Sequence, residues 1–325
     1  MSSAKSALLR IASRGSALAL TQARLVQTAL LSAHNLAEAE RDTLFPIIAV
    51  KTSGDKIQDR PLAELGGKGL FVKEIEEALL QDDADIAVHS MKDMPGISPK
   101  GLFIGAVLER EDPRDVFVAG DGATFTDARA ALASLRQGAR LGTSSVRRQA
   151  LAKRLRPDIE IVSLRGNVET RLAKLARGEA DATILARAGL TRLGLQPMGA
   201  TALDENAWPS APCQGAIGIE LRCGDGKAVT LTAKISHHDS AITVACERGF
   251  LAALDGSCRT PIAGLARCAS NKLSFTGEVL TPDGRHSWKV TRDLNGDVNL
   301  STAEQLGREA AQDIKGRAGD RLPKF

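Results

Sequence analysis

Residues 8–32 read LLRIASRGSALALTQARLVQTALLS and join a short apolar run to an amphipathic stretch. Leu8–Ser13 is predicted to be a core strand, and Ala17–Ser32 the helix that follows it. The same alternation continues along the chain, as it does in folds built from βαβ units. The sequence therefore predicts an α/β fold.

Two α/β units of similar size are expected, with their boundary at Glu109–Arg114. In the first unit, further strands are expected at Leu44–Lys51, Asp85–Val88 and Phe103–Leu108, with a helix at Leu70–Gln81. In the second unit, strands are expected at Asp115–Ala119, Ala139–Thr143, Glu160–Ser163 and Asp181–Leu185, with helices near Ser145–Arg156 and Asn167–Arg177.

A third, smaller α+β unit is expected to begin near His237. Its signals are a helix at Asp239–Leu254, strands at Lys272–Leu280 and Arg285–Arg292 around the turn Thr281–Gly284, and a closing helix at Ser301–Gly316. Pro209–Pro212 is interpreted as a connection, and Ala216–Glu220 as a strand that returns to the first unit. The predicted domains are therefore 1–110 with about 215–235, 111–212, and 237–325.

Positive charge is concentrated in one part of the chain. The net charge is only +4, but residues 136–192 contain eleven Arg and two Lys against five acidic residues. Aromatic residues make up 3% of the chain and Tyr is absent. Proteins that bind single-stranded nucleic acid usually need aromatic stacking platforms as well as cations. The basic segment is therefore expected to meet a small anionic ligand rather than a nucleic acid.

The cysteines and the N-terminus favour the cytoplasm. Five Cys is an odd number, no two have C-x-x-C spacing, and no secretory signal is recognised, so free thiols in a reducing compartment are expected. No acidic residue precedes Glu38, which is also typical of a transit peptide. The predicted strand and helix within residues 8–32 argue against that alternative. No apolar run approaches the ~20 residues of a membrane helix.

Polar segments follow several predicted strands. Open α/β sheets bind ligands beyond the carboxyl ends of their strands, so two such units predict a ligand cleft between them. The segments at these positions are Arg10 and Arg14 around the first strand, His89–Asp93, Gly142–Arg148 and Arg165–Asn167.

The arginines in these segments are candidates for anion binding, because a guanidinium fork matches a carboxylate bidentately and stays charged. We assign this role to those in or beside strand-end loops, and a solvated helix surface to the others. The first group is Arg147, Arg148, Arg165 and Arg171, and the second is Arg154, Arg156 and Arg177. Ser144 and Ser145 stand at a helix start, where backbone amides also favour anions.

Two further segments have alternative interpretations. Gly66–Gly69 fails the P-loop pattern, so it is interpreted as a flexible, lid-like loop in which Lys68 is a candidate anion contact. Asp93 in a strand-end loop is either a surface turn residue or, among arginines, a group that stabilises a cation or exchanges a proton. His237 and His238 lack a third ligand nearby, so no metal site is predicted.

Cys258, in the small-residue loop Gly256–Cys258, is the expected accessible thiol. Most cysteines in isolation are buried and inert. Cys213, beside Gln214, is the competing candidate.

Seven segments together resemble the porphobilinogen deaminase (hydroxymethylbilane synthase) family. Each is a weak signal alone, but their shared order and approximate spacing are specific, and the match runs from Arg10 to about Pro261. The segments are Leu9–Arg14, Gly67–Phe71, His89–Asp93, Glu109–Asp115, Gly142–Arg148, Arg165–Val168 and Gly256–Cys258.

The resemblance implies two α/β domains like those of periplasmic binding proteins, a third, smaller α+β domain, and a monomer. It implies a dipyrromethane cofactor joined to Cys258 by a thioether, and porphobilinogen as the substrate. Asp93 matches the catalytic aspartate. The positions matching cofactor contacts are Ser90, Lys92, Thr143, Ser144, Ser145, Arg147, Arg148 and Gln214. Those matching substrate contacts are Arg10, Arg14, Lys68, Phe71, Arg165 and Arg171.

The implied reaction removes ammonia from porphobilinogen and joins the resulting cation to the terminal pyrrole of an enzyme-bound chain. Each added ring brings two carboxylates, which accounts for the many arginines. The sequence departs from the family pattern at Glu64, where relatives often carry Lys, and at Cys213, where Gly is common. The alternative function is that of a periplasmic-type carboxylate-binding protein without catalysis.

Overall fold

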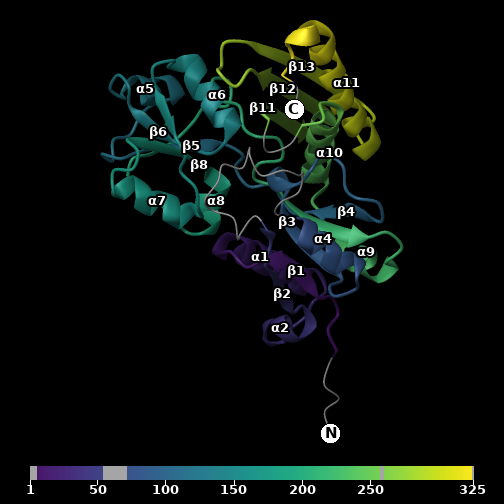
Figure 1. The fold of residues 1–325 in the computed structure, drawn as a ribbon. Helices are drawn as coiled ribbons and strands as arrows, with labels where there is room; N and C mark the ends of the chain where they lie inside the picture. The colour runs from purple at the N-terminus through teal and green to yellow at the C-terminus, as the bar shows by residue number, and fades with distance from the viewer. Residues whose placement is uncertain (1–5, 54–71, 257–259, 324–325) are drawn as a thin grey trace.

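The computed structural model describes residues 6–53, 72–256 and 260–323 (Figure 1). Three predicted site residues lie outside the described residues: Lys68, Phe71 and Cys258. The predicted lid from Thr52 to Gly67 also lies outside them, apart from its first two residues. Within the described part, the strands form two five-stranded sheets and one three-stranded sheet.

The first sheet is mostly parallel, with strand order β2-β1-β3-β10-β4. Strands β1, β2 and β3 run parallel, and β10 is antiparallel to both of its neighbours. The strands are β1 (Ile11–Arg14), β2 (Ile47–Val50), β3 (Ile86–Ser90), β4 (Leu102–Val107) and β10 (Ile217–Arg222). The helices are α1 (Ala17–Ala33), η1 (Glu38–Glu40), α2 (Arg41–Leu44), α4 (Lys73–Leu80), η2 (Met91–Asp93) and α9 (Gly226–Ala233).

Both faces of the central strands are covered: alternate residues of a strand point to opposite sides, and helices pack on each side. Ile86 of β3 packs with Val26 of α1 on one face, and Ala87 packs with Ile75 of α4 on the other. Burial on both faces explains why Ile86–Val88 of β3 form a continuous apolar run rather than an alternating one.

The second sheet repeats the arrangement of the first, with strand order β7-β6-β8-β5-β9. Here β6, β7 and β8 run parallel, and β5 is antiparallel to β8 and β9. The strands are β5 (Asp115–Ala119), β6 (Arg140–Gly142), β7 (Glu160–Val162), β8 (Ala182–Ala186) and β9 (Ala200–Ala202). The helices are α5 (Ala128–Ala133), α6 (Val146–Leu155), α7 (Val168–Ala176) and α8 (Arg187–Arg192).

The antiparallel strand of each sheet is the one that enters from the other sheet, since β5 follows β4 and β10 follows β9. Asp115, the first residue of β5, pairs with Ala186, the last residue of β8. Ile217, the first residue of β10, likewise pairs with Ser90, the last residue of β3. Both crossing segments therefore arrive at the edges where the parallel strands end.

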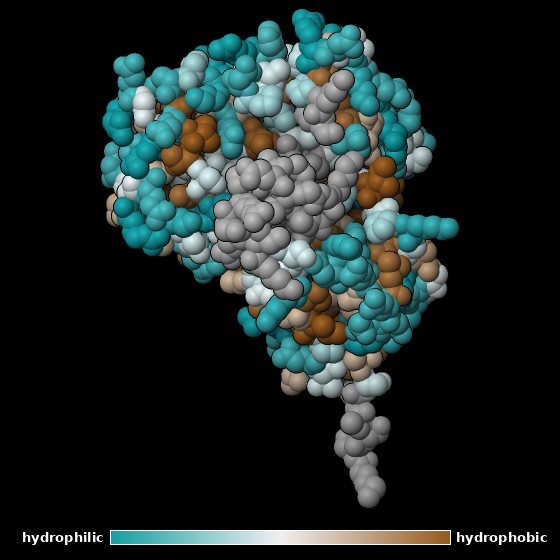
Figure 2. All heavy atoms as spheres, in the orientation of Figure 1, coloured by the Kyte–Doolittle hydropathy of each residue, from teal (hydrophilic) through white to brown (hydrophobic). Residues whose placement is uncertain are grey.

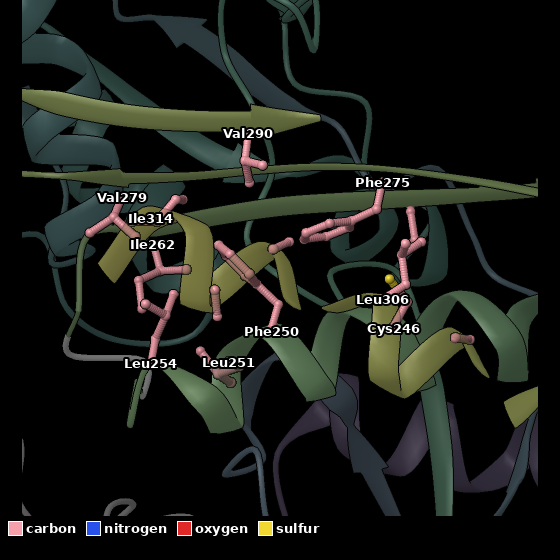
Figure 3. Close-up of a cluster of buried hydrophobic side chains, with 14 of the residues drawn as sticks. Cys246, Phe250, Leu251, Leu254, Ile262, Phe275, Val279, Val290, Leu306 and Ile314 are labelled. Carbon is pink, nitrogen blue, oxygen red and sulfur yellow. The ribbon is translucent and has the colours of Figure 1, made fainter. Parts of the chain in front are cut away.

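The third unit packs two helices against an antiparallel sheet of order β11-β12-β13. Its core is apolar and includes the rings of Phe250 and Phe275, whose centroids are 5.0 Å apart in an edge-to-face arrangement (Figure 3). The elements are α10 (His238–Ala253), β11 (Ile262–Ala269), β12 (Lys272–Leu280), β13 (Ser287–Asn295), α11 (Leu300–Ala318) and η3 (Gly319–Arg321).

The third unit contacts both of the others (Figure 1). Arg248 of α10 donates from Nη1 to the Pro95 carbonyl at 2.9 Å, just after β3 and η2 of the first unit. Arg154 of α6, in the second unit, donates from Nη1 to Glu278 of β12 at 2.5 Å. These polar contacts tie the α+β unit to both α/β units.

The predicted fold class, two α/β units followed by a smaller α+β unit, is confirmed by the sheet topology. The predicted domain boundaries stay a prediction. Sequence periodicity missed several elements, mostly short ones in which a period cannot be recognised: α2, α5, α8, α9, β9 and β11.

Candidate functional site

The polar segments predicted at strand ends lie at the two edges where the crossing segments arrive. Ser90, Lys92 and Asp93 end or follow β3, and Lys92 and Asp93 form part of the 3-10 helix η2 (Met91–Asp93). Thr143, Ser144 and Ser145 follow β6. Gln214 precedes β10 and donates from Nε2 to Asp115 Oδ1 at 2.9 Å, so the returning segment is tied to the second sheet.

Asp115, the first residue of β5, lies at the strand-end edge of the second sheet and is contacted by several polar side chains there. Its carboxylate is fully buried and accepts hydrogen bonds from Arg147, Arg148, Gln214 and Trp208. Burial alone would raise the pKa of this carboxyl, but the charges of Arg147 and Arg148, with the added hydrogen bonds, hold the pKa well below its usual range. The group is therefore a fixed negative charge.

Arg147 and Arg148 lie at the predicted edge of the second sheet, but their guanidinium groups are already paired within the protein. Their side chains are only 3% and 7% exposed, because both pair with Asp115. Arg147 also donates to the Pro209 carbonyl at 2.6 Å, and Arg148 to the Ile184 carbonyl at 2.8 Å. The expectation that both guanidinium groups present a bidentate fork to a ligand does not fit this geometry.

Positive charge predominates around Asp93. Burial lowers the pKa of Lys92 to about 8, with Asp93 opposing the shift and Arg148 adding to it. Burial also lowers the pKa of Arg171 to about 10, again with Arg148 adding to the effect and Asp93 opposing it. Lys92, Arg148 and Arg171 therefore act on one another as like charges, with Asp93 beside them. A ligand with several carboxylates would relieve this repulsion.

The lowered pKa of Lys92 gives a pH prediction. Without a bound anion the folded protein loses this proton near pH 8, well below the ordinary value for Lys, whereas a bound carboxylate favours the charged form. Anion binding then takes up a proton, so the Kd of the ligand-free protein for a small polycarboxylate is expected to rise by about tenfold between pH 7 and 9. Lys92→Arg, which stays charged, should flatten this rise; an unchanged pH profile of Kd in that variant would contradict the assignment.

The other predicted residues occupy varied positions. Ser145 caps α6 by accepting from the Arg148 backbone N–H, and Thr143 is buried and accepts from the Ser145 N–H at 3.2 Å. Ser144 shares a hydrogen bond with Ser163 at 3.2 Å. Ser90 accepts from Gln22 of α1 at 3.3 Å. Arg14 ends β1, and Arg165 follows β7.

Arg10 is not brought to this site. It precedes β1, at the amino end of the strand, and its guanidinium bonds to Asp85 at 2.8 Å and to Asp82 at 3.0 Å. Asp85 and Asp82 precede β3, at the edge opposite to Ser90. The prediction that Arg10 contacts substrate therefore fails, because the strand begins only at Ile11 and leaves Arg10 at its far end.

None of the described cysteines is an accessible thiol of lowered pKa beside Asp93. Cys213 is 2% exposed, and burial followed by the charge of Glu247 raises its pKa to about 12. Cys258 lies outside the described residues, but α10, which precedes it, packs on the loop after Asp93. A Cβ placed on Gly96 would lie 2.7 Å from the backbone nitrogen of Ala252, near the end of α10.

Two residues of the site were missed by sequence reasoning, Asp115 and Trp208. Asp115 is predicted to begin an apolar strand, Asp-Val-Phe-Val-Ala, and to end the family-like segment Glu109–Asp115, but neither pattern gives its side chain a role. An acidic residue opening an otherwise continuous apolar run, next to an arginine-rich second unit, is the signal that indicates a buried counter-ion. No group of His, Cys, Asp and Glu within the described residues is arranged to hold a metal ion.

Family models match most of the chain. The model described as porphobilinogen deaminase, dipyromethane cofactor binding domain, matches residues 9–230, and the model of the C-terminal domain of the same enzyme matches residues 241–316. The chain belongs to the porphobilinogen deaminase family. A porphobilinogen deaminase of Paracoccus denitrificans is 49% identical over 310 residues, which cover 95% of this chain and 94% of that protein.

Family membership makes this protein an enzyme of the transferase class, with a dipyrromethane-cofactor-binding domain at residues 9–230. The alternative, a binding protein without catalysis, is not favoured. No helix among the described residues is both long and apolar enough to cross a membrane.

Two solved structures show a more distant similarity. The VFT2 domain of Bordetella pertussis BvgS is 16% identical, with a TM-score of 0.41 over 70% of this chain and 85% of that chain. An ancestral cationic amino acid solute-binding protein is also 16% identical, with a TM-score of 0.40 over 70% of this chain and 87% of that chain.

Proposed function

We propose that the protein deaminates and condenses four porphobilinogen molecules stepwise on a dipyrromethane joined to Cys258, and that Asp93 is the catalytic carboxylate. The observation that supports this best is the cluster at the strand ends, where Asp93 follows Lys92 in η2 and its charge acts on Lys92 and Arg171, the two cations that Arg148 repels. A dipyrromethane with two carboxylates on each ring suits a cluster in which buried and partly buried positive charges repel one another.

The cofactor, when bound, supplies a nucleophilic carbon on its terminal pyrrole ring. The residues that would hold its carboxylates are Lys92, Arg148 and the hydroxyl groups at the start of α6. Arg148 retains one unused hydrogen on each terminal nitrogen after its bonds to Asp115 and Ile184. Arg14, Arg165 and Arg171 are proposed for the carboxylates of the incoming substrate.

Asp93 is proposed to give a proton to the leaving amine of porphobilinogen. The C–N bond then breaks, ammonia leaves, and the cation that remains on the substrate's pyrrole is stabilised by the Asp93 carboxylate. A C–C bond forms to the substrate's methylene carbon, and the proton displaced from the attacked ring returns to Asp93. Atoms and charge balance over each cycle, with no added oxidant or reductant.

Attachment through Cys258 rather than Cys213 is supported by burial. A thiol must ionise to act as a nucleophile, and the raised pKa of Cys213 leaves it protonated at neutral pH. The position of the end of α10 against Gly96 also supports a cysteine that reaches the neighbourhood of Asp93.

We also propose that the enzyme is a cytoplasmic monomer that acts on neither nucleic acid nor membrane. On the face in Figure 2, apolar residues appear as separate groups among hydrophilic ones. The most exposed large apolar side chains of the described residues, such as Ile97 and Met198, come from separate segments.

The test of the proposed function is stoichiometry. Purified protein given porphobilinogen is expected to release one ammonia for each ring consumed and one linear tetrapyrrole for every four rings. Binding of porphobilinogen with no ammonia release would instead identify a carboxylate-binding protein.

A further inference from the structure

The Asp115 carboxylate accepts five hydrogen bonds from four side chains. They come from Arg147 Nη2 at 2.7 Å, Arg148 Nε at 3.2 Å and Nη2 at 2.6 Å, Gln214 Nε2 at 2.9 Å, and Trp208 Nε1 at 2.9 Å. Its donors therefore come from α6 and from the segment that returns the chain to β10. A single buried anion thus links the arginine helix to the crossing between the two sheets.

These bonds fix the orientation of Arg148. Its Nε–Nη2 edge faces Asp115, and Nη1 donates to the Ile184 carbonyl at 2.8 Å, so the guanidinium plane is held from two sides. Of Arg147 and Arg148, Arg148 is the one whose charge helps to lower the pKa of Lys92 and of Arg171. The orientation of Arg148 therefore contributes to how positive charge is distributed around Lys92 and Arg171.

We propose that Asp115 is a positioning residue, which holds the Arg148 guanidinium beside Lys92 and Arg171 where carboxylates of the pyrrole chain bind, and which couples it through Gln214 to the interdomain crossing. The inference rests on the proposed function. Asp115 itself touches neither cofactor nor substrate, because its oxygens are occupied by the five donors.

The charge of Asp115 is essential to this role. An amide at the same position offers one acceptor oxygen and places N–H donors against guanidinium N–H groups. Two buried arginines would then share no counter-ion, and Arg148 would be expected to turn away from its present orientation. A glutamate keeps the charge and displaces it by one methylene.

The variants to compare are Asp115→Asn, Asp115→Glu and Trp208→Phe, with Asp181→Asn as the matched control. Asp181 also pairs with two arginines of the second unit, Arg136 and Arg140, but it precedes β8 and so lies at the opposite edge of the same sheet. Each protein is purified with whatever cofactor it acquired during expression, and no cofactor or substrate is added. The measurements are intact mass for cofactor loading, Tm, and kcat and KM per loaded molecule.

Asp115→Asn is expected to lower cofactor loading, because Arg148 is proposed to hold the cofactor's carboxylates. In the loaded fraction it should raise KM for porphobilinogen by at least about tenfold, with a smaller change in kcat, because Arg171 beside Arg148 is proposed for the substrate's carboxylates. Asp115→Glu should restore part of the difference, and Asp181→Asn should leave KM and loading at wild-type values. Wild-type KM in loaded, folded Asp115→Asn, with only Tm lowered, would overturn the proposal, because a purely structural carboxylate affects Tm alone.

If Asp115→Asn fails to fold, Trp208→Phe decides the question, since it removes one hydrogen bond to the carboxylate and keeps the charge and most of the ring volume. A rise of about threefold in KM at wild-type loading supports the proposal, and an unchanged KM overturns it. Failure of the proposed function is seen separately, because the wild-type protein would then release no ammonia.

Discussion

Asp93→Asn is expected to slow single-turnover ammonia release by about 10²–10⁴-fold, the usual contribution of general acid–base catalysis. The substitution keeps the shape of the side chain but removes the charge and the transferable proton. Substrate affinity should change little, because the cations that meet its carboxylates remain. The measurement uses protein whose cofactor loading has been verified by mass, since failed assembly would resemble failed catalysis.

Two controls make this prediction specific. Asp93→Glu keeps the charge one methylene away and should fall between wild type and the Asn variant. Asp82→Asn removes an exposed carboxylate at the opposite edge of the first sheet and should release ammonia at the wild-type rate. A fully loaded Asp93→Asn protein with wild-type release would remove Asp93 from the mechanism.

Cys258→Ser is expected to abolish tetrapyrrole formation, because a hydroxyl group does not form the thioether that holds the cofactor. The protein should carry no covalent pyrrole and should remain folded. The control is Cys213→Gly, in which a buried thiol at φ +60° is replaced by the residue that best tolerates that conformation. Peptide mapping that finds the adduct on Cys213 would reverse the assignment.

Sequence reasoning recovered most elements of the fold. The predicted strands at Asp115–Ala119 and Lys272–Leu280 have the bounds that the structure gives them, and the helix after β1 ends within one residue of its prediction. These segments have strong periods or clear turns on either side. By contrast, β9 has three residues, too few for any period to be recognised.

The location of the site was easier to predict than the contacts within it. Strand-end segments are recognisable because parallel strands present their carboxyl ends to one edge. The pairing of Arg147 and Arg148 with Asp115 was not predicted, since this carboxylate stands 32 residues before Arg147 in sequence. Only the antiparallel pairing of β5 with β8 brings that carboxylate to the same edge.

Arg10 illustrates the sensitivity of such predictions to element bounds. Reading the strand as Leu8–Ser13 placed Arg10 inside it, whereas the strand begins at Ile11. The acidic partners of Arg10 lie in the turn that precedes β3, 72 and 75 residues away. No local pattern indicates such a long-range pair.

The central claim, growth of a pyrrole chain on an enzyme-bound dipyrromethane, is tested most directly by the denatured intact mass during porphobilinogen addition. Resting protein is expected to exceed its sequence mass by two linked pyrrole units, and this excess should survive denaturation. Limiting porphobilinogen should then add one, two, three and four further rings, all located on the peptide that contains Cys258. A denatured mass equal to that of the bare chain, before and after substrate, would contradict the account.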